Sequence, residues 1–587
     1  MLRKLASCIR EYKLPSILTS VFISLEVIVE CFIPFLTAGL INEIQTGCNM
    51  NRILIYGGGL VLMAMLSLSF GALSGHFCAV ASSGFAKNLR HDLYHHVQDF
   101  SFANIDKFST SSLVTRLTTD VTNVQNAYMM IIRIAIRSPL MLVVAFVMSI
   151  NLGGSLAWIF AVILPILGFA LFFIIAKVKP LFKKVFKKYD KLNESVQENI
   201  RGMRVVKAFI REDYEKEKFD KASDEVRGDF TRAEKILAFN NPIMQLCMYT
   251  ATILIAFFCS KIVISTGVLG ADGTVISDLG IGTLSGMMTY SMQVLMSMMM
   301  VSMIFVMITL SIESANRIVE VLNEESTLTS PENPIMSVEN GNIDFDNVFF
   351  KYSKEAEKFS LDNINLHIKS GQTVGIIGVT GSSKTSLVNL ISRLYDVTDG
   401  SVKVGGIDVR KYDLDTLRNN VAVVLQKNVL FSGTIKENLR WGNPDATDEE
   451  LEHVCKLAQA DEFIQGFPDK YDTYIEQGGT NVSGGQKQRL CIARALLKKP
   501  KILILDDSTS AVDTRTDAMI RKAFKSEIPG TTKIIIAQRI ASVEDADIIV
   551  VMEDGKIAAC GNHNELMKSS DIYREVYTSQ TKRGDEE

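Results

Sequence analysis

The residues best suited to chemistry lie in a loop of small side chains that follows the apolar strand Thr373 to Ile377. The loop reads GVTGSSKT, and a helical pattern follows it directly. Small residues let backbone N–H groups and a helix N-terminus converge on phosphate oxygens, where Lys384 reaches the outer phosphates and Thr385 ligates Mg²⁺. We therefore expect a nucleotide phosphate chain at Gly378, Thr380, Gly381, Ser382, Ser383, Lys384, Thr385 and Ser386.

A second strand is expected to bring a carboxylate to this loop. The apolar segment Ile502 to Leu505 ends in Asp506, and the carboxyl ends of parallel strands share one edge of a sheet. There Asp506 can hold Mg²⁺ through water beside Thr385. From Asp344 onward, short β-branched strands alternate with helical patterns, which indicates α/β organisation. We assign residues 342–587 to this phosphate-loop domain.

Composition places the rest of the chain in lipid and excludes some functions. Hydrophobic residues make up 47% of the 587 residues and charged residues 22%, so the apolar excess must be concentrated in one region. The 62 basic and 65 acidic side chains give a net charge of −3, which argues against a nucleic-acid binder. Nine scattered cysteines without a CxxC pair predict neither a zinc site nor a disulfide framework.

The apolar excess lies in the first half as six predicted spans. Runs of about 20 mostly apolar residues, enough to cross a bilayer as helix, begin near Leu14, Ile53, Tyr128, Gly154, Phe239 and Gly280. We expect an all-α transmembrane domain over residues 14–322. The preceding residues 1–13 carry four basic side chains among apolar ones, without a cleavage site, and predict an amphipathic helix on the membrane surface.

The connections between the spans sort by charge. Lys87 to Gln125 and Lys177 to Lys235 are long and rich in Lys and Arg, whereas Asn151 to Ser155 and Thr266 to Asp278 are short and nearly devoid of them. By the positive-inside rule, we expect a multi-pass protein of the cytoplasmic membrane whose two termini both lie in the cytoplasm.

The two long segments read as helices that continue the spans into the cytoplasm. Each has a turn-like interruption, at Asp106 to Ser112 and at Phe209 to Tyr214, where a short crosswise helix could meet a cytoplasmic domain. The polar segment 323–341 has two prolines and no periodicity, so we interpret it as a linker between two domains.

The segment Val482-Ser483-Gly484-Gly485-Gln486, between the phosphate loop and Asp506, carries a family resemblance. It resembles the signature motif of the ATP-binding cassette (ABC) superfamily, and six spans followed by one such domain resemble a half-size exporter of the multidrug type. The resemblance covers essentially the whole chain. It implies the type IV exporter fold, ATP and Mg²⁺ as cofactors, and ATP-driven export across the membrane.

Other family motifs match residue by residue. Tyr352 stands where the family stacks an aromatic ring on adenine, and Gln426 matches the glutamine that touches Mg²⁺. The segment Glu476 to Asn481 resembles the exporter loop that contacts the long cytoplasmic helices. Ser510 and Asp513 belong to a segment that resembles the D-loop, which lies across the dimer interface in the family.

Two departures from the family concern the residues that do chemistry. Asp507 follows Asp506 where the family has the glutamate that orients the attacking water, and a carboxylate about 1 Å too short can cost on the order of 10²-fold in rate. Gln538 replaces the switch histidine and cannot become cationic. Ser383 also replaces a glycine, at a cost of on the order of 1 kcal/mol if the position needs a positive φ.

The pattern predicts one half of a heterodimer. ABC domains bind ATP between two subunits, so the intact Ser483, Gly484, Gly485 and Gln486 would complete the competent site of a sibling half-transporter, while this chain's own site hydrolyses slowly. The alternative is a homodimer with two equally poor sites.

Candidate cargo contacts lie in the first and sixth spans. Glu26 and Glu30 share one helix face and could attract cationic compounds or a proton, or else pair with Arg133 or Arg137. The sixth span is rich in methionine, which adapts to varied apolar ligands, although ordinary helix packing would also use it. Within it we single out Gln293, Met296 and Met300.

Two other functions stay open at this point. The first is export of another cargo class, such as a lipid or a peptide. The second is a non-pumping channel or membrane sensor that uses ATP binding as a switch, which the altered site would suit. An intact sibling subunit would favour pumping, and its absence would favour the sensor.

Overall fold

The computed structural model describes residues 1–45, 47, 49–266, 268–269, 275–276, 280–353, 355–508 and 511–584. They divide into two units, each described by itself. The first unit consists of Met1–Gln98 and Thr110–Glu324, and the second of Asp99–Ser109 and Glu325–Glu587. Ser510 and most of the connection expected at Thr266 to Asp278 lie outside the described residues.

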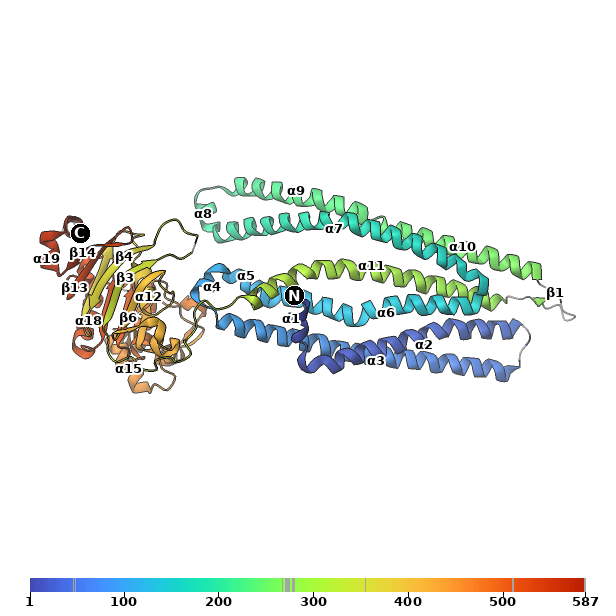
Figure 1. Ribbon diagram of the computed structural model, residues 1–587, viewed down its shortest axis with the longest axis horizontal. Coiled ribbons are helices and arrows are strands. Elements are labelled where there is room, and N and C mark those ends of the chain that lie inside the picture. The colour runs from blue at the N-terminus through green and yellow to red at the C-terminus, as the bar shows by residue number, and fades with distance from the viewer. Residues whose placement is uncertain are drawn as a thin grey trace. The chain divides into compact units, whose positions relative to one another are not determined.

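The first unit is a bundle of long helices (Figure 1). Its elements are α1 (Leu2–Ser7), η1 (Arg10–Tyr12), α2 (Lys13–Gln45), α3 (Met50–Gln98), α5 (Thr110–Thr115), η2 (Arg116–Asp120), α6 (Val121–Gly153), η3 (Gly154–Ala157), α7 (Trp158–Arg201), α8 (Met203–Ala208), α9 (Glu212–Leu237), α10 (Asn240–Thr266), β1 (Val268–Leu269), β2 (Val275–Ile276) and α11 (Ile281–Asn323). All-α architecture is therefore confirmed for this half, apart from the two short strands.

Five helical stretches of the described chain are long and apolar enough to cross a membrane. They are Arg10–Gln45, Met50–Gln98, Thr110–Phe182, Glu212–Thr266 and Ile281–Asn323. The third contains α6 and the first part of α7, which are joined through η3 at Gly154, where φ is +52°. Counting α6 and α7 separately accounts for the six apolar spans that the sequence predicts.

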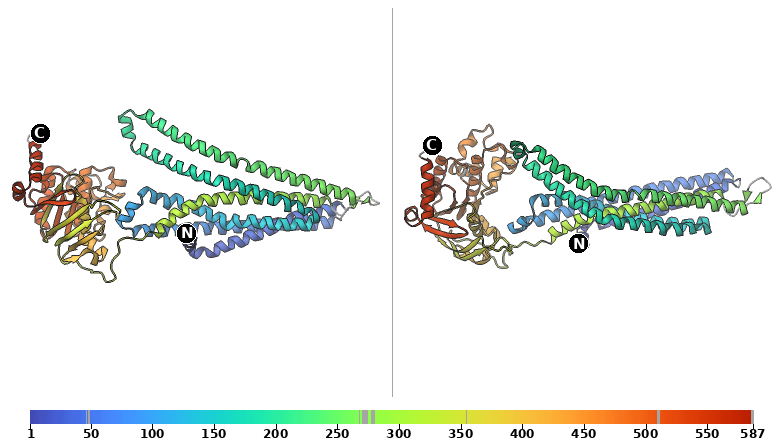
Figure 2. Two further views of the ribbon diagram at one scale, coloured as in Figure 1. Left: turned by 45° about the horizontal axis from the view of Figure 1, so that its top comes forward. Right: turned by 90° about the horizontal axis from the view of Figure 1, so that it is seen from above.

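Apolar side chains of α2, α6 and α11 form one core of the bundle. Val27, Met141, Ala145, Tyr290 and Val294 are all buried there. The pair α7 and α9 runs side by side away from this core to the short helix α8 (Figure 2). The sequence predicts a short crosswise helix at the interruption from Phe209 to Tyr214. The short helix α8 ends at Ala208, just before that segment, and the chain turns at 209–211 before α9 begins at Glu212.

The second unit is an α/β domain joined by the short helix α4 (Phe102–Lys107) from the first half of the chain. Its sheets use β3 (Ile343–Phe350), β4 (Leu361–Ile368), β5 (Thr373–Gly378), β6 (Asp399–Val404), β7 (Ile407–Asp408), β8 (Val421–Val424), β9 (Gly433–Thr434), β10 (Tyr474–Ile475), β11 (Ile502–Asp506), β12 (Thr532–Ile536), β13 (Ile548–Glu553) and β14 (Lys556–Gly561).

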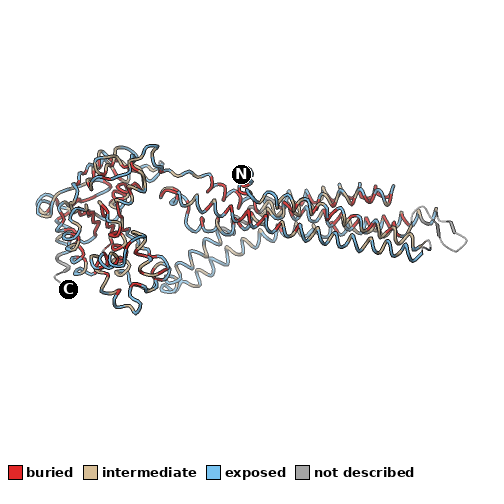
Figure 3. Tube along the Cα trace, turned by 90° about the horizontal axis from the view of Figure 1, so that it is seen from below, coloured by how far each residue is buried: buried red, intermediate tan, exposed pale blue. Residues whose placement is uncertain are grey.

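Helices surround these strands. They are α12 (Lys384–Ile391), α13 (Leu414–Asn420), α14 (Ile435–Arg440), α15 (Asp448–Leu457), α16 (Asp461–Gln465), α17 (Gly484–Leu496), α18 (Thr514–Glu527), α19 (His563–Ser569) and α20 (Asp571–Gly584), with short turns η4 (Val409–Lys411), η5 (Lys470–Asp472), η6 (Gln477–Gly479) and η7 (Ile540–Ser542). Buried residues concentrate in this unit's sheets, whereas the long helices of the other unit carry many exposed residues (Figure 3).

The order of the main sheet decides where the site lies. Six strands follow the order β14-β13-β5-β12-β11-β8, and all neighbours are parallel except β14 with β13. A separate antiparallel sheet has the order β4-β3-β6-β7. Because β5, β8, β11 and β12 are parallel neighbours, the residues that follow them emerge at one edge. This edge brings together the phosphate loop, Gln426, Asp506 and Gln538.

Candidate functional site

In the phosphate loop, residues 379–383 connect β5 to α12, and two of these five residues have a positive φ. Gly381 has a φ of +90°, and Ser383, directly before the helix, has φ +68° and ψ +26°. The left-handed region costs a residue with a Cβ about 1–2 kcal/mol. Ser383 therefore adopts the conformation that a glycine would occupy without strain, which meets the condition stated for this position in the sequence analysis.

Lys384 is the first residue of α12 and folds over the loop. Its Nζ donates hydrogen bonds to the carbonyl oxygens of Gly378 at 2.8 Å and of Val379 at 3.0 Å. Burial lowers the pKa of Lys384, and the nearby carboxylates of Asp506 and Asp507 oppose that shift. A phosphate would supply this ammonium with a stronger acceptor than the two carbonyls.

Thr385 and Asp506 meet as the parallel sheet predicts. The Thr385 hydroxyl donates to Asp506 Oδ2 at 2.9 Å, and Asp506 is only 3% exposed. Burial raises the pKa of Asp506, while the Thr385 hydrogen bond lowers it. A hydroxyl and a carboxylate are oxygen donors of the kind Mg²⁺ prefers beside substrate phosphates, so the pair fits this ion, which would neutralise phosphate charge there.

Asp507 and Gln538 contact each other. Gln538 Nε2 donates to Asp507 Oδ2 at 2.8 Å, and Asp507 itself has a left-handed φ of +48°. The amide nitrogen carries two hydrogens, so one remains to donate to a phosphate oxygen, but an amide cannot carry a proton away. The geometry therefore holds the carboxylate and the amide as one unit beside the phosphate loop.

Tyr352 lies at the start of the loop after β3 and is 49% exposed. Its hydroxyl and that of Ser386 in α12 are 2.8 Å apart, so the ring lies next to the phosphate loop. Stacking of this ring on adenine stays a prediction. Gln426 lies two residues after β8 with an exposed side chain. Its role at Mg²⁺ stays a prediction.

The signature segment forms the N-terminus of α17. Ser483 caps the helix, because its hydroxyl accepts from the Gln486 N–H at 3.2 Å while Gln486 Oε1 accepts from the Ser483 N–H at 2.8 Å. Ser483 and Gly484 are exposed. Such a helix end presents backbone N–H groups and the positive end of the helix dipole to an anion.

The D-loop region packs against this helix. Gln488 of α17 accepts a hydrogen bond from the Ala511 N–H at 3.1 Å, and a Cβ on Gly485 would lie 2.8 Å from the Ala511 carbonyl oxygen. Asp513 caps α18 by accepting from the Thr516 N–H at 2.9 Å. The approach of Gly485 to Ala511 explains why a glycine stands there.

Sequence reasoning missed Tyr395, which connects the site to α4. Its hydroxyl donates to Asp106 Oδ2 at 2.6 Å, and its ring lies edge to face with those of Tyr352 (centroids 5.1 Å apart) and Phe102 (6.2 Å). Burial and the Asp106 carboxylate both raise the pKa of Tyr395, which stays protonated and donates. The aromatic residue after α12 was the available signal.

The predicted cargo carboxylates bind an arginine. Arg137 of α6 contacts Glu26 through one guanidinium nitrogen and Glu30 through the other, the latter at 2.6 Å. Of the two arginine candidates, Arg137 makes the contact. A contact of these acids with cargo stays a prediction. The bridge joins α2 to α6 because two intramembrane carboxylates need a compensating cation.

The methionines of α11 separate into buried and exposed groups. Met287 is fully buried, whereas Met292, Met296, Met299 and Met303 are exposed at spacings of four, three and four residues, which defines one helix face; Met300 is exposed as well. Gln293 Oε1 is buried and has no hydrogen-bond partner within the part of the chain that the structure describes. An unpaired buried amide oxygen is costly, at about 1–3 kcal/mol.

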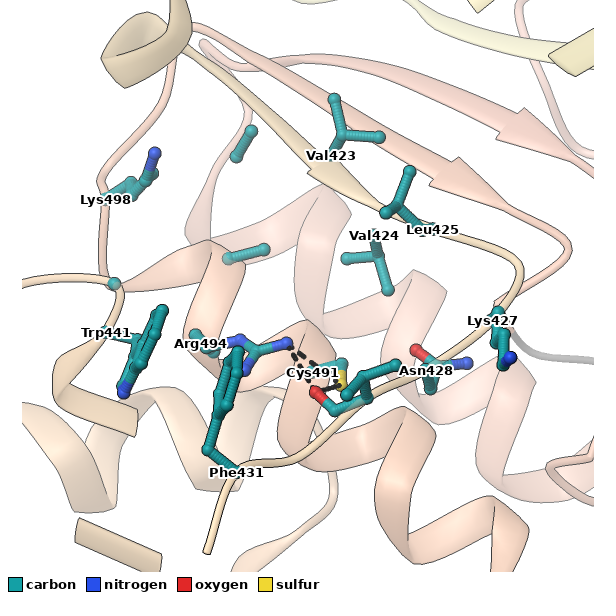
Figure 4. A pocket seen from close by; sticks show the side chains of 14 residues that line it. Val423, Val424, Leu425, Lys427, Asn428, Phe431, Trp441, Cys491, Arg494 and Lys498 are labelled. Atoms are coloured by element: carbon teal, nitrogen blue, oxygen red, sulfur yellow. Dashed lines mark hydrogen bonds between the residues drawn. The ribbon is translucent and has the colours of Figure 1, made fainter. Parts of the chain in front are cut away.

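A groove of about 320 Å³ opens beside β8 and α17 (Figure 4). Phe431 and Trp441 stack along one side with ring centroids 4.0 Å apart. Arg494 donates to the Val429 carbonyl at 3.1 Å and lies with Lys498 in the lining. The groove therefore combines an aromatic wall with basic side chains, next to the segment that carries Gln426.

Known proteins match both units. Residues 17–298 match the ABC transporter transmembrane region family, and residues 361–510 match the ABC transporter family. The ABC transporter ATP-binding protein YfiB of Bacillus subtilis is 34% identical over 579 residues, which cover 99% of this chain and 98% of YfiB. YknU of the same organism is 33% identical over 84% of this chain and 82% of its own length.

A solved bacterial Atm1-family ABC exporter with ATP bound has the same fold, with a TM-score of 0.78 at 22% identity over 97% of this chain and 98% of that one. Two family matches and full-length relatives thus agree with the phosphate loop, signature helix and apolar helices described above. The chain belongs to the ABC transporter family, with a transmembrane domain followed by an ATP-binding domain.

Proposed function

We propose that this chain is one half of a heterodimeric ATP-driven exporter and that its own ATP site retains ATP while hydrolysing it slowly. The single observation that carries the proposal is the Asp507–Gln538 pair, which replaces a glutamate and a histidine at the place where water must be activated. Lys384, Thr385 and Asp506 supply the groups that bind the phosphates and Mg²⁺, so the site binds ATP although it hydrolyses ATP slowly.

The signature helix supports the second half of this proposal. Ser483 and Gly484 are exposed, and the N-terminus of α17 can accept a phosphate from another chain. A sibling half-transporter with a glutamate and a histidine would supply the catalytic groups, and this chain would complete that site with Ser483, Gly484, Gly485 and Gln486. Hydrolysis would then occur mainly at the sibling's Walker motifs.

An exposed helix tip also supports a second subunit. At the turn after α8, Phe209 is 73% exposed and Ile210 is 84% exposed, and Val205 in α8 is 60% exposed. The groove beside β8 offers the aromatic wall of Phe431 and Trp441 for such a tip. We infer that the corresponding tip of the sibling subunit docks in this groove. We also propose that the protein lies in the cytoplasmic membrane and that both termini of each chain lie in the cytoplasm.

The proposed cargo is a hydrophobic or amphipathic compound. The exposed face with Met296 and Met300 offers polarizable, adaptable contacts, and the unpaired Gln293 oxygen can accept from a cargo N–H or O–H group. Arg137 contacts one oxygen of Glu26 and one of Glu30, so we propose helix pairing as the first role of these acids. The other Glu26 oxygen is buried without a hydrogen-bond partner in the described part of the chain, and attraction of cationic compounds by these acids stays part of the proposal.

A non-pumping ATP-gated protein is the second candidate, and the same Asp507–Gln538 pair is the observation that favours it. One experiment separates the two. The chain is purified from its native membrane with its partner, and the partner's residue at the position of Asp507 is determined from its sequence. ATP-dependent uptake of hydrophobic dyes into inverted vesicles is then measured. Uptake with a glutamate-bearing partner is expected, whereas no partner and no uptake would contradict the exporter proposal.

A further inference from the structure

The C-terminal helix α20 holds the backbone of the segment that carries Gln538. Gln580 Nε2 donates to the Gln538 carbonyl oxygen at 2.8 Å, and Gln580 Oε1 accepts from the Ile540 N–H at 2.8 Å. The two bonds flank Arg539 and fix the main chain on both sides of it. One amide side chain thus clamps the turn that leaves β12.

This clamp stands on an anchored support. Tyr573, two helical turns before Gln580 and therefore on the same face of α20, is fully buried. Its hydroxyl lies 2.8 Å from His563 Nδ1 of α19, and Val576 and Tyr577 pack against the core of the unit. Gln580 is therefore fixed by the helix rather than carried by a loose tail.

The clamped segment positions a side chain at the nucleotide half-site. Gln538 uses one amide hydrogen on Asp507, and its second hydrogen can donate to the γ-phosphate of ATP held at Lys384. Both bonds require the Gln538 backbone to stay in place. If the Gln538 backbone could move, its side chain would lose the phosphate contact more often, because the amide N–H groups bind only within hydrogen-bond distance.

We propose that Gln580 is a positioning residue that prolongs ATP retention at this chain's own site by fixing the backbone of Gln538. The inference rests on the proposed function, in which this site retains ATP. It extends the ATP site to α20, which lies outside the phosphate-loop, signature and D-loop segments. Changes near the C-terminus should then alter nucleotide retention without touching a nucleotide-binding residue.

The test measures release of a radiolabelled photoreactive ATP analogue from the full-length chain with its partner in nanodiscs. Photolysis at successive times shows how much label stays on this chain. Gln580→Ala should speed the loss about 3- to 10-fold, as expected for two hydrogen bonds. Ser579→Ala is the matched control, because Ser579 is the exposed neighbour in α20 and the change likewise replaces a polar side chain with alanine.

Two further variants separate positioning from general stability. Gln580→Glu keeps the acceptor for Ile540 and loses the donor to Gln538, so it should release label as fast as Gln580→Ala. In a Gln538→Ala background, Gln580→Ala should have no further effect, because it acts through that side chain. Additive effects, or retention by Gln580→Glu equal to wild type, would overturn the inference.

Release of label from the wild-type complex distinguishes failure of the proposed ATP-retaining site from failure of the role proposed for Gln580. If the wild-type complex holds no label on this chain, the proposed retention site is wrong and the role of Gln580 falls with it. If the wild type retains label and Gln580→Ala retains it equally long, the inference about Gln580 alone is wrong.

Discussion

Gln538 donates a hydrogen bond to Asp507 at 2.8 Å, so the two residues that depart from the family chemistry are direct partners. A shortened carboxylate and a neutral amide replace a longer base and a titratable imidazole. Under the proposed function, each change alone weakens water activation, and together they leave a bonded pair that has little capacity to move a proton.

Lys384→Ala should reduce nucleotide trapping on this chain. We expect its ammonium to reach the outer phosphates, and the two loop carbonyls that it now contacts cannot bind phosphate in its place. We expect at least about a tenfold loss of photolabelling, in line with removal of a charge-assisted bond. Labelling of the partner in the same sample is the control, and unchanged labelling of this chain would refute the assignment of the phosphate loop.

Arg137→Gln should destabilise the transmembrane domain. The change leaves Glu26 and Glu30 inside the bundle without their cation, and breaking a buried ion pair from one side costs about 3 kcal/mol. Thermal unfolding in detergent measures the loss. The triple variant Glu26→Gln, Glu30→Gln, Arg137→Gln should recover most of it, because no charge is left unpaired; a triple variant as unstable as Arg137→Gln would point to a packing role for the guanidinium.

Tyr395→Phe should weaken the response of ATP hydrolysis to cargo. It removes only the hydroxyl that donates to Asp106 of α4, and it keeps the ring beside Tyr352. Bonds to charged groups are worth about 1.5–3 kcal/mol, so we expect cargo stimulation to fall about tenfold while ATP affinity changes less than about twofold. Asp106→Asn should have a similar effect, and the double variant should be no worse than either single one; additivity would show that the two side chains act separately.

Local motifs and strand order predicted which segments meet at the candidate nucleotide site, because its parts lie within short segments whose spacing has a direct chemical meaning. The Thr385–Asp506 contact follows from two parallel strands, and the left-handed φ of Ser383 fits the glycine that the family has at that position. Contacts between distant segments could not be read in this way. Tyr395 and Asp106 are 289 residues apart, and only the folded chain shows them as partners.

The transmembrane half was less predictable for a different reason. Helix faces can be read from periodicity, but the rotation of one helix against another cannot. The two carboxylates of α2 had two arginine candidates and a cargo alternative, and packing of α2 on α6 selects Arg137. Likewise, the exposed methionine face of α11 depends on which side of that helix its neighbours cover.

The central claim is that the two ATP sites are unequal, and steady-state ATPase activity of two variants of the purified complex tests it most directly. Ser483→Arg leaves Lys384, Thr385 and Asp506 of this chain intact. It places a bulky cation where the N-terminus of the signature helix must bind the γ-phosphate of the ATP held by the sibling. Asp507→Asn alters only a carboxylate that is already short for water activation. We expect Ser483→Arg to reduce ATPase activity more than about 10²-fold and Asp507→Asn to change it less than about twofold. A severe loss in Asp507→Asn together with a tolerated Ser483→Arg would contradict the account.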